Sequence, residues 1–516
     1  MIYVILGQTA SGKTSLALKL AKELNIPIIS ADAYQCYKYM QIGTDKPSLD
    51  MVKDVSYHFF DEYDLNQNMS VFQFQKEGRK LIEKYNALGK DIIVTGGTFL
   101  YIKALLFNYK FNKENNTDNY DLFSLDELKS LLKEKSIETY NLIDNNNPRR
   151  VIRALRQIDN GFDPKELNSS NNEKTIYPCT FFQIDVDINS GNTLIDKRVD
   201  EMFLNGFVDE VKNIISKYDM NLPSLKAIGY PEVISYLNNE IDLNQAKELI
   251  KTHTHQLAKK QRTFLRHQFL NVYLKSKEEI YSLIYNDVKL KERSRILLKE
   301  KVNLLESKNV LLAGLGGVGG TVLLSLIRLG VKNITIVDKD IVDPTNLNRQ
   351  FLYNYYDIGK DKASVAKSKA LEISPICNIN IKSIFITSKD DFKDEKYDYV
   401  IDCIDDLKAK AQLYLKAKED HGKLITSMGF GFHLNSTKIK IGKLKETNGH
   451  MVSIYKDELK KLNVCDEEID DIDTVFPTDA RIKNVMNSKT IGSIVTCPNG
   501  AGLAIISLFV MLNLGG

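Results

Sequence analysis

The sequence lacks the features that place a protein outside a reducing compartment or in a membrane. Its six cysteines are scattered and form no CxxC pair, so neither a zinc knuckle nor a disulfide framework is indicated. No export signal, with a charged segment, an apolar core and a cleavage site in series, opens the chain. The most apolar run, at 501–513, is shorter than the roughly twenty residues that cross a bilayer. These absences predict a cytoplasmic protein with no membrane partner, and a core helix at 501–513.

Net charge is also nearly absent, at +3 across 516 residues. A nucleic-acid partner would therefore have to be bound by local basic surface, because no global field attracts it. Hydrophobic residues make up 43% of the chain and charged residues 27%, which is a globular balance with ample material for a core. The length exceeds one ordinary domain. We expect two or three domains.

The first half alternates short apolar runs with helical stretches from residue 1 to about 110. Examples are the strand IYVIL, a helix from Lys13, and a polar helix near 71–87. This alternation predicts a parallel α/β sheet covered by helices. Together with the glycine-rich loop described below, it resembles the fold of P-loop NTPases. The polar stretches 112–121 and 168–174 are expected from their composition to have no regular structure. A small helical insertion is expected between them, so that insertion and stretches together span about 111–175.

The second half opens a new series of strands and helices, so we place a domain boundary at 285. The segment 286–301 is typical of one charged amphipathic helix. Three later strands end in polar residues, as sites at the carboxyl ends of parallel strands require. The expected domains are 1–285, a P-loop domain, and 286–516, a Rossmann-like α/β domain. The series opens with NVLLAGLG, and the three later strands are NITIVDKD, YDYVIDCID and KLITSMG.

The segment GQTASGKTSL at 7–16 has the form of a phosphate-binding loop. It follows a buried strand and opens a helix, which is the context that the P-loop pattern requires. The glycines let backbone N–H groups turn inward on a diphosphate, the lysine adds a charge, and a threonine hydroxyl can hold Mg²⁺. An ordinary strand-to-helix turn is the alternative. The residues assigned to this phosphate site are Gly7, Thr9, Gly12, Lys13 and Thr14.

Five further segments decide whose phosphate this loop holds. Together they resemble the tRNA dimethylallyltransferases, in order and spacing, over nearly all of residues 1–275. The resemblance implies that the loop binds the diphosphate of dimethylallyl diphosphate, and that the prenyl group goes to the exocyclic amine of the adenosine 3′ of the tRNA anticodon. The segments are IISADAYQCYKYMQIGTDKPS at 28–48, GGTFLYIKALL at 96–106, RRVIRALR at 149–156, LPSLKAIGY at 222–230 and QLAKKQRTFLR at 256–266.

The resemblance also assigns roles in catalysis. Asp32 matches the base that the weakly nucleophilic amine needs, and Thr98 of GGT matches a position beside the reacting centre. Lys13 and Thr14, with Mg²⁺, are expected to stabilise the leaving diphosphate. Gln35 matches a position that reads a base near the target adenosine. Taken alone, Asp32 is as typical of a turn or helix cap.

Basic residues supply the expected contacts to the anticodon stem-loop. From composition alone, the segment 252–268 is equally typical of a solvated basic helix face. Two positions, His255 and Lys226, differ from the arginine that many family members have, and neither reproduces its bidentate fork. A zinc site at His253 and His255 lacks further ligands. The residues assigned to tRNA are Gln35, Arg150, Arg153, Lys259, Lys260, Arg262 and Arg266.

A second glycine-rich loop, GLGGVGG at 314–320, follows a strand of the second half. Its G-x-G-x-x-G spacing, with Asp338 about twenty residues on, is typical of NAD binding when taken alone. The segment VDKDIVDPTNLNRQFLYNYYDIGKDKA at 337–363 instead resembles the ubiquitin-activating-type adenylating enzymes, in which the same loop holds ATP. The loop residues assigned to the nucleotide are Gly314, Gly316, Gly317 and Gly319.

This second resemblance implies adenylation of a carboxylate, with loss of diphosphate. Asp338 is expected to bind the ribose hydroxyls, and Asp405 of DCIDD to hold Mg²⁺. The residues expected to neutralise the triphosphate are Asn348, Arg349 and Lys362, of which the last two are assigned to catalysis, and Asp340 belongs to the same nucleotide site. Singly, each residue is also typical of a cap or a solvated side chain. An isolated cysteine such as Cys403 or Cys465 is more typical of inert packing.

Within this superfamily the chain is most similar to the tRNA threonylcarbamoyladenosine dehydratases, in segments such as RILLKEKVNLLESKNVLLAGLGGVGG, LITSMGFG and GSIVTCPNGAG. Such an enzyme adenylates the carboxylate of a threonylcarbamoyl group on adenosine and lets it cyclise. Activation of a ubiquitin-like or sulfur-carrier protein stays open as an alternative, although carrier-activating relatives commonly have the CxxC pairs missing here. A binding module with inactive chemistry and an NAD dehydrogenase are less favoured. We expect a bifunctional tRNA-modifying enzyme that forms a homodimer through its second domain.

Overall fold

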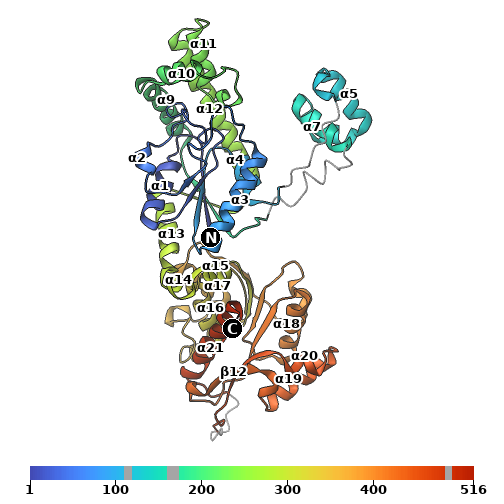
Figure 1. The fold of residues 1–516 in the computed structure, drawn as a ribbon. Coiled ribbons are helices and arrows are strands. Elements are labelled where there is room, and N and C mark those ends of the chain that lie inside the picture. The colour runs from blue at the N-terminus through green and yellow to red at the C-terminus, as the bar shows by residue number, and fades with distance from the viewer. Residues whose placement is uncertain (110–118, 160–173, 483–490, 516) are drawn as a thin grey trace. The chain divides into compact units, whose positions relative to one another are not determined.

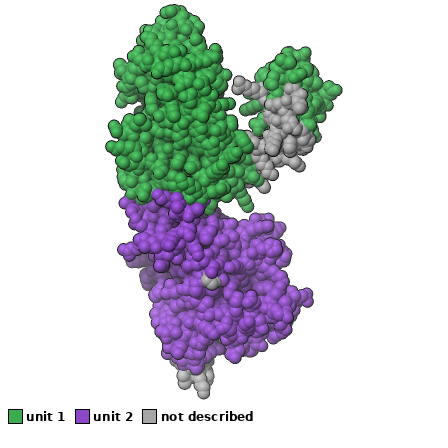
Figure 2. All heavy atoms as spheres, viewed as in Figure 1, with its two compact units in different colours: residues 1–85, 91–281 green, residues 86–90, 282–516 purple. Residues whose placement is uncertain are grey.

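The computed structural model describes residues 1–109, 119–159, 174–482 and 491–515. The chain forms two compact units (Figure 2). Unit 1 comprises residues 1–85 and 91–281, and unit 2 comprises residues 86–90 and 282–516. The division falls within helix α13 (Lys277–Leu290), the helix that also contains the expected boundary at 285. Both units are α/β folds, as the sequence predicts.

Unit 1 is built on a parallel sheet with the strand order β3-β2-β4-β1-β5-β6 in the described residues. The central strand β1 is buried along its whole length, because it pairs with parallel strands on both sides and helices cover the sheet. Helix α1 packs on β1, β2 and β4 (Figure 1). The strands are β1 (Ile2–Leu6), β2 (Ile28–Ser30), β3 (Tyr57–His58), β4 (Ile92–Thr95), β5 (Cys179–Ile184) and β6 (Val272–Lys275).

The helices of unit 1 confirm the alternating pattern, since the predicted helix at 71–87 is α3 and the helix from Lys13 is α1. The longest is α12, which begins with a capping box at Asp242. The helices are α1 (Lys13–Leu24), α2 (Leu49–Val52), α3 (Val71–Ala87), α4 (Phe99–Leu106), α9 (Ile188–Leu204), α10 (Phe207–Ile215), α11 (Tyr230–Leu237) and α12 (Leu243–Gln268).

The predicted helical insertion contains α5 (Leu125–Lys135), α6 (Ile137–Leu142) and α7 (Pro148–Asp159). It has a small core of its own, formed by Tyr120, Leu128, Leu132, Val151, Ala154 and Leu155. The polar stretches at 112–121 and 168–174 lie mostly outside the described residues. Where 112–121 is described, the expectation of no regular structure is wrong, because Tyr120–Leu122 forms a 3-10 turn that buries the Tyr120 ring in this core.

Unit 2 is built on a mixed sheet with the strand order β12-β13-β11-β10-β7-β8-β9 in the described residues. All neighbours are parallel except β12 and β13, which are antiparallel at one edge. The strands are β7 (Asn309–Ala313), β8 (Asn333–Val337), β9 (Asn378–Lys382), β10 (Tyr399–Asp402), β11 (Lys423–Ser427), β12 (Ile439–Lys443) and β13 (Asp473–Pro477). The helices that cover them are α16 (Gly317–Arg328), α17 (Lys362–Ile373), α18 (Leu407–Glu419), α19 (His450–Lys461), α20 (Asp466–Asp470) and α21 (Thr496–Leu514).

Two helical predictions for unit 2 have different outcomes. The single helix expected at 286–301 is wrong: α13 ends at Leu290, and α14 (Glu292–Leu298) ends before Lys299, whose left-handed φ of 53° stops it. A short helix, α15 (Val302–Glu306), follows. The core helix at 501–513 is confirmed as part of α21, which packs on α16 and is buried at Ala501, Ile505 and Phe509. Among helices in the described residues, α21 is long and apolar enough by composition to cross a membrane.

Candidate active sites

The phosphate loop of unit 1 joins the carboxyl end of β1 to the start of α1. Gly12 has a left-handed φ of 82°, which a residue with a side chain would adopt only with strain. Lys13 is buried, and its ammonium donates a 2.6 Å hydrogen bond to the carbonyl of Gln8. Burial lowers the pKa of Lys13 to about 8, although the nearby Asp32 carboxylate opposes this shift. The lysine is therefore held at the loop with its charge only partly compensated.

Asp32 follows β2 at the same edge of the sheet. Its Oδ1 accepts hydrogen bonds from the N–H groups of Tyr34 at 3.0 Å and Gln35 at 3.2 Å, which caps the following turn. Within the described part of the chain, its Oδ2 accepts no hydrogen bond, and it lies 3.3 Å from the position that a Cβ on Gly97 would occupy. One oxygen of Asp32 therefore caps a turn, the other accepts no hydrogen bond from the described residues, and the role of Asp32 as the base stays a prediction.

Thr98 follows β4 and is adjacent to this carboxylate. Its Oγ1 accepts a 3.0 Å hydrogen bond from the N–H of Ala33, and its own N–H donates to the carbonyl of Ala31. Gln261, from the buried side of α12, connects the two loops. Its Oε1 accepts from the N–H of Thr9 at 2.8 Å, and its Nε2 donates to the carbonyl of Gly97 at 2.9 Å.

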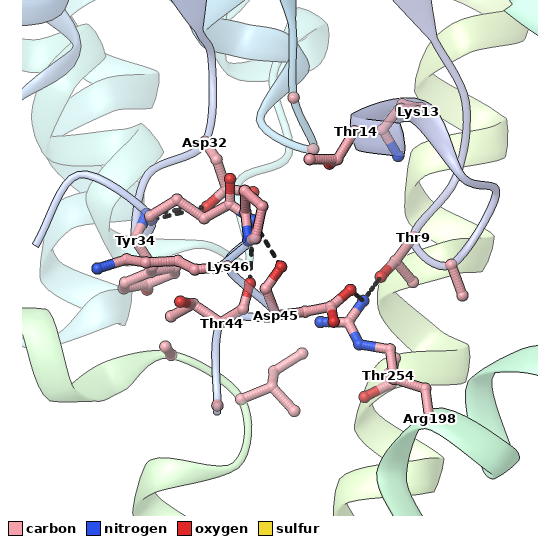
Figure 3. A pocket seen from close by; sticks show the side chains of 18 of the residues that line it. Thr9, Lys13, Thr14, Asp32, Tyr34, Thr44, Asp45, Lys46, Arg198 and Thr254 are labelled. Carbon is pink, nitrogen blue, oxygen red and sulfur yellow. Dashed lines mark hydrogen bonds and ion pairs between the residues drawn. The ribbon is translucent and has the colours of Figure 1, made fainter. Parts of the chain in front are cut away.

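These residues surround one cavity of about 740 Å³ (Figure 3). Its lining includes the assigned residues Thr9, Gly12, Lys13, Thr14, Asp32, Gln35 and Thr98. It also includes the apolar side chains Leu18, Ile195, Val199, Met202, Ile250 and Leu257. Gly7 lies at the base of the loop, where a Cβ would come within 2.6 Å of Ser11 Oγ. The cavity is thus suited to a ligand with an anionic head and a short apolar tail.

Two charged residues of this cavity were not found from the sequence. Arg198 of α9 donates from Nη1 to Thr9 Oγ1 at 3.0 Å, and the same nitrogen lies 3.3 Å from Asp45 Oδ2. Arg198 lies in a segment with no recognised motif, and Asp45 lies in the segment 28–48 that resembles the family, but no role was assigned to it from the sequence. Gln35 lines the cavity as expected, but its amide nitrogen donates to the carbonyls of Thr44 and Asp45.

The residues present fit a divalent cation bound with a phosphorylated ligand. The Thr14 hydroxyl lies on the cavity wall, and Asp32 supplies a carboxylate oxygen nearby. Among the residues that the structure describes, no group of three or more His, Cys, Asp or Glu side chains could hold a metal ion by itself. A cation at this site would therefore be shared between the protein and the oxygens of the ligand.

The basic face of α12 carries Lys259, Lys260 and Arg266, all of which are exposed. Arg262 points to the phosphate loop, where it donates to Gln8 Oε1. Two of the three histidines of this helix have carboxylate partners: His253 lies 2.6 Å from Glu232 and His255 lies 2.7 Å from Asp196.

Arg150 and Arg153 lie on α7 of the insertion and are exposed. Arg150 is 3.7 Å from Asp144, a solvent-exposed pair that contributes little to stability.

In unit 2, the second glycine loop joins β7 to α16. Gly314 has a φ of 86°, and a Cβ on Gly319 would lie 1.8 Å from the carbonyl oxygen of Gly314, so the loop closes only with glycine at this position. Asp338, at the end of β8, accepts from the N–H groups of Leu315 at 2.7 Å and Asp340 at 2.9 Å. Burial raises the pKa of Asp338.

The other assigned residues of unit 2 gather around this loop to different extents. Lys362, at the start of α17, is 3.1 Å from Asp340 Oδ2. Arg349 donates to Asn348 Oδ1 at 3.0 Å and to the carbonyl of Thr345, and it is half-buried. Asp405 is exposed on the loop after β10, and the carbonyl of Cys403 in that loop lies 2.8 Å from the Cβ position of Gly314.

Further polar residues near this site are not evident from the sequence. Gln350 is buried beside Gly316, and its Oε1 has no hydrogen-bond partner among the described residues, as expected of a group that faces a polar ligand. Asp402 and Lys410 form a fully buried pair at 3.0 Å, and Lys410 also donates to the carbonyl of Ser427 at 2.9 Å. Burial strongly raises the pKa of the Cys403 thiol, which makes it a poor nucleophile.

The fold and these sites define a P-loop-type phosphate-binding unit followed by a Rossmann-like unit with a nucleotide-type glycine loop. The IPP transferase family model matches residues 35–268, and the ThiF family model matches residues 291–507. The tRNA dimethylallyltransferase of Clostridioides difficile is 35% identical over 274 residues, which cover 51% of this chain and 88% of the relative. That of Exiguobacterium sp. is 34% identical over 299 residues, covering 56% and 95%. The chain belongs to the tRNA dimethylallyltransferase family and carries a ThiF-family domain in its second half.

Solved structures match each half separately. A eukaryotic dimethylallyltransferase captured acting on tRNA shares the fold, with 22% identity, a TM-score of 0.50, and coverage of 57% of this chain and 79% of that one. The E. coli tRNA N6-threonylcarbamoyladenosine dehydratase TcdA covers 43% of this chain and 92% of its own, with 26% identity and a TM-score of 0.40. Because this TM-score is below 0.5, the class of the second half rests on the ThiF match.

Proposed function

We propose that unit 1 transfers a dimethylallyl group from dimethylallyl diphosphate to the exocyclic amine of the adenosine 3′ of the tRNA anticodon. The observation that carries this proposal is the shared cavity, in which the available oxygen of Asp32 and the ammonium of Lys13 line the same space. In the reaction the amine nitrogen forms a bond to the allylic carbon, the carbon–oxygen bond to diphosphate breaks, and Asp32 accepts the proton of the amine.

The polar and the apolar residues that line the cavity have different parts in this chemistry. Lys13, Arg198 and the N–H groups of the loop stabilise charge on the departing diphosphate. Mg²⁺ bound by Thr14 and the phosphate oxygens would supply further positive charge. Thr98 orients the turn that carries Asp32, through its contact with Ala33. The apolar side chains of the lining exclude water from an allylic group with carbocation character.

The basic face of α12 and the exposed arginines of α7 are the surfaces proposed to bind tRNA phosphates. Recognition at the anticodon loop suits this cavity, because a base in a single-stranded loop leaves its stack more easily than a base in a duplex. Replacing Lys259 and Lys260 together with alanine is expected to raise the KM for tRNA and to leave the KM for dimethylallyl diphosphate unchanged.

We propose that unit 2 uses ATP to adenylate the carboxylate of threonylcarbamoyladenosine at the same tRNA position, after which the group cyclises with loss of AMP. The support is the glycine loop, whose Leu315 N–H donates to Asp338, the pairing of Lys362 with Asp340, and the buried, unpartnered Oε1 of Gln350, whose amide nitrogen lies near Gly316. Arg349 would contact the triphosphate and Asp405 would hold Mg²⁺, which neutralises charge as diphosphate leaves.

Activation of a ubiquitin-like or sulfur-carrier protein is the second candidate for unit 2, because the ThiF match by itself names no substrate. The two are distinguished by ATP–diphosphate exchange with purified full-length protein. Exchange that requires threonylcarbamoylated tRNA supports the proposal. Exchange that requires an added carrier protein supports the alternative. The expected homodimer stays a prediction, and sedimentation of the full chain tests it.

Nucleoside mass spectrometry of total tRNA tests both halves together. Cells lacking both modification enzymes receive the wild-type chain, Asp32→Ala or Asp405→Ala. We expect prenyl-adenosine to disappear only with the first substitution and the cyclic threonylcarbamoyl product only with the second. Absence of the cyclic product with the wild-type chain would exclude the proposed substrate of unit 2. Because both groups occupy the same amine, no single adenosine receives both, and channelling between the units is not expected.

A further inference from the structure

A carboxylate stands inside the cavity proposed to hold a diphosphate. Asp45 lines this cavity, and its Oδ2 lies 3.3 Å from Arg198 Nη1. The same nitrogen donates to Thr9 Oγ1 at 3.0 Å, so Arg198 bridges the phosphate loop and Asp45 (Figure 3). The carboxylate of Asp45, which repels phosphate, is thus paired with Arg198, a cation that also contacts the phosphate loop.

The segment that carries Asp45 is braced from two sides, so the position of this carboxylate is set by the fold. Glu210 of α10 accepts hydrogen bonds from three successive N–H groups, at 2.9, 2.7 and 3.1 Å; the donors are Gln41, Ile42 and Gly43. From the other side, the Gln35 amide donates to the carbonyls of Thr44 and Asp45. Asp45 itself has a left-handed φ of 52°, which aspartate tolerates better than most residues.

Charged side chains of both signs line the cavity and offset one another in the absence of a ligand. Lys13 and Arg198 face Asp32 and Asp45, and both carboxylates act electrostatically on Lys13. Lys46 also lines the cavity, but its ammonium is 2.7 Å from Asp61 and is fully buried. Asp32 has a proposed part in the reaction as the base, whereas Asp45 has none. A diphosphate entering this space gains Lys13 and Arg198 but is repelled by Asp45.

We propose that Asp45 is a place-holder for the diphosphate: it orients and neutralises Arg198 in the empty site and gives up that guanidinium when the leaving group binds. The inference rests on the proposed assignment of this cavity to a prenyl diphosphate. Because the Asp45–Arg198 pair re-forms when the site empties, Asp45 weakens binding of the substrate and of inorganic diphosphate alike. Its benefit is faster release of the product, which carries the same charged group as the substrate.

Calorimetric titration of the full-length protein with inorganic diphosphate tests this. Asp45→Asn and Asp45→Gly both suit a left-handed backbone, so at least one folded variant is expected. Each should bind inorganic diphosphate about fivefold more tightly than the wild type, with and without Mg²⁺. The KM for dimethylallyl diphosphate should fall by a similar factor, a change that general damage to the fold would not produce.

The matched control is Asp200→Asn. Asp200 lies on α9, the helix of Arg198, and its carboxylate is 3.2 Å from Lys251 of α12 and outside the cavity lining. This substitution should leave diphosphate binding unchanged. If the wild type does not bind diphosphate at all, the assignment of the cavity is wrong. If the wild type binds and the Asp45 variants bind equally or more weakly, the place-holder is refuted. Weaker binding only with Mg²⁺ would make Asp45 a cation ligand instead.

Discussion

The side-chain carbonyl of Gln261 accepts a 2.8 Å hydrogen bond from the N–H of Thr9, across 252 residues of sequence. The amide nitrogen of the same side chain donates to the carbonyl of Gly97. One buried glutamine of α12 therefore fixes the distance between the phosphate loop and the segment that carries Thr98. Because the exposed face of α12 is basic, the helix proposed to contact tRNA also positions the loops around the cavity.

Replacing Gln261 with leucine should separate these loops without changing the volume of the side chain. The N–H of Thr9 and the carbonyl of Gly97 would each lose a buried partner, at a cost of about 1–3 kcal/mol per group. We expect kcat/KM for dimethylallyl diphosphate to fall at least about tenfold, because a small misplacement of catalytic groups has large effects on rate. Gln256→Leu, an exposed position on the same helix, is the control. Equal kcat/KM for the two variants would contradict the role of Gln261.

The lowered pKa of Lys13 predicts an alkaline limit on diphosphate binding. Its charged form binds the ligand, and its pKa in the free protein is about 8. We expect kcat/KM for dimethylallyl diphosphate, measured at saturating tRNA, to decrease as the pH rises through about 8. In Lys13→Arg the guanidinium stays charged, so this decrease should disappear from the pH profile. A wild-type profile that stays flat to pH 9.5 would contradict the prediction.

The same ionisation acts on stability in the opposite sense. The pKa of Lys13 is lower in the folded than in the unfolded chain, so the unfolded chain binds more protons between about pH 8 and 10.5. The contribution of Lys13 to the free energy of unfolding therefore increases across this window.

In unit 2, Gly319→Ala should disrupt the glycine loop itself. The new Cβ would lie 1.8 Å from the Gly314 carbonyl, which is backbone and cannot move aside alone. A destabilisation of about 3 kcal/mol or more is expected. Hydrogen exchange of the β7 and α16 peptides, followed by mass spectrometry, reports on this unit separately. In the control Gly316→Ala, the Cβ would meet only Gln350 Nε2 at 3.8 Å, so exchange should be unchanged.

Lys410→Met should leave Asp402 buried without its cation. Breaking such a pair typically costs about 3–5 kcal/mol, and we expect faster hydrogen exchange in β10 and β11. Adding Asp402→Asn to Lys410→Met should recover part of the loss, because no charge then remains buried. Lys408→Met, on the exposed side of the same helix, should have little effect. If the double variant were less stable than Lys410→Met alone, the two residues would not act as a pair.

Much of the fold could be predicted from the sequence, because its signals are local. Both glycine loops lie between a buried strand and a helix, and the apolar period of α3 gives its bounds. The five-residue edge strands β9 and β12 were missed, because each has only two apolar side chains and forms no distinct apolar run. The break at Lys299 was missed because one left-handed residue leaves no mark on helical periodicity.

The candidate sites were predictable only where a motif spans consecutive residues. Asp32 and Thr98 lie in such segments, and the structure places both beside the phosphate loop. Asp45 and Gln261 also lie in such segments, whereas Arg198 does not. All three contact residues far away in sequence, so their roles became evident only from the tertiary fold. The structure also places Arg262 against Gln8, a pairing that its membership of a basic run does not indicate.

The strand order of unit 1 bears on how the protein is made. β1 precedes the other strands of unit 1 in the sequence, but its two neighbours are β4 and β5, whose register pairs Ile2 with Ile92 and with Cys179. The helical insertion is translated between those neighbours. Both edges of this apolar strand therefore stay incompletely paired during most of the synthesis of unit 1. Unpaired strand edges attract non-native partners. The nascent chain is most in need of chaperone protection before residue 184 emerges, ahead of any residue of the second sheet.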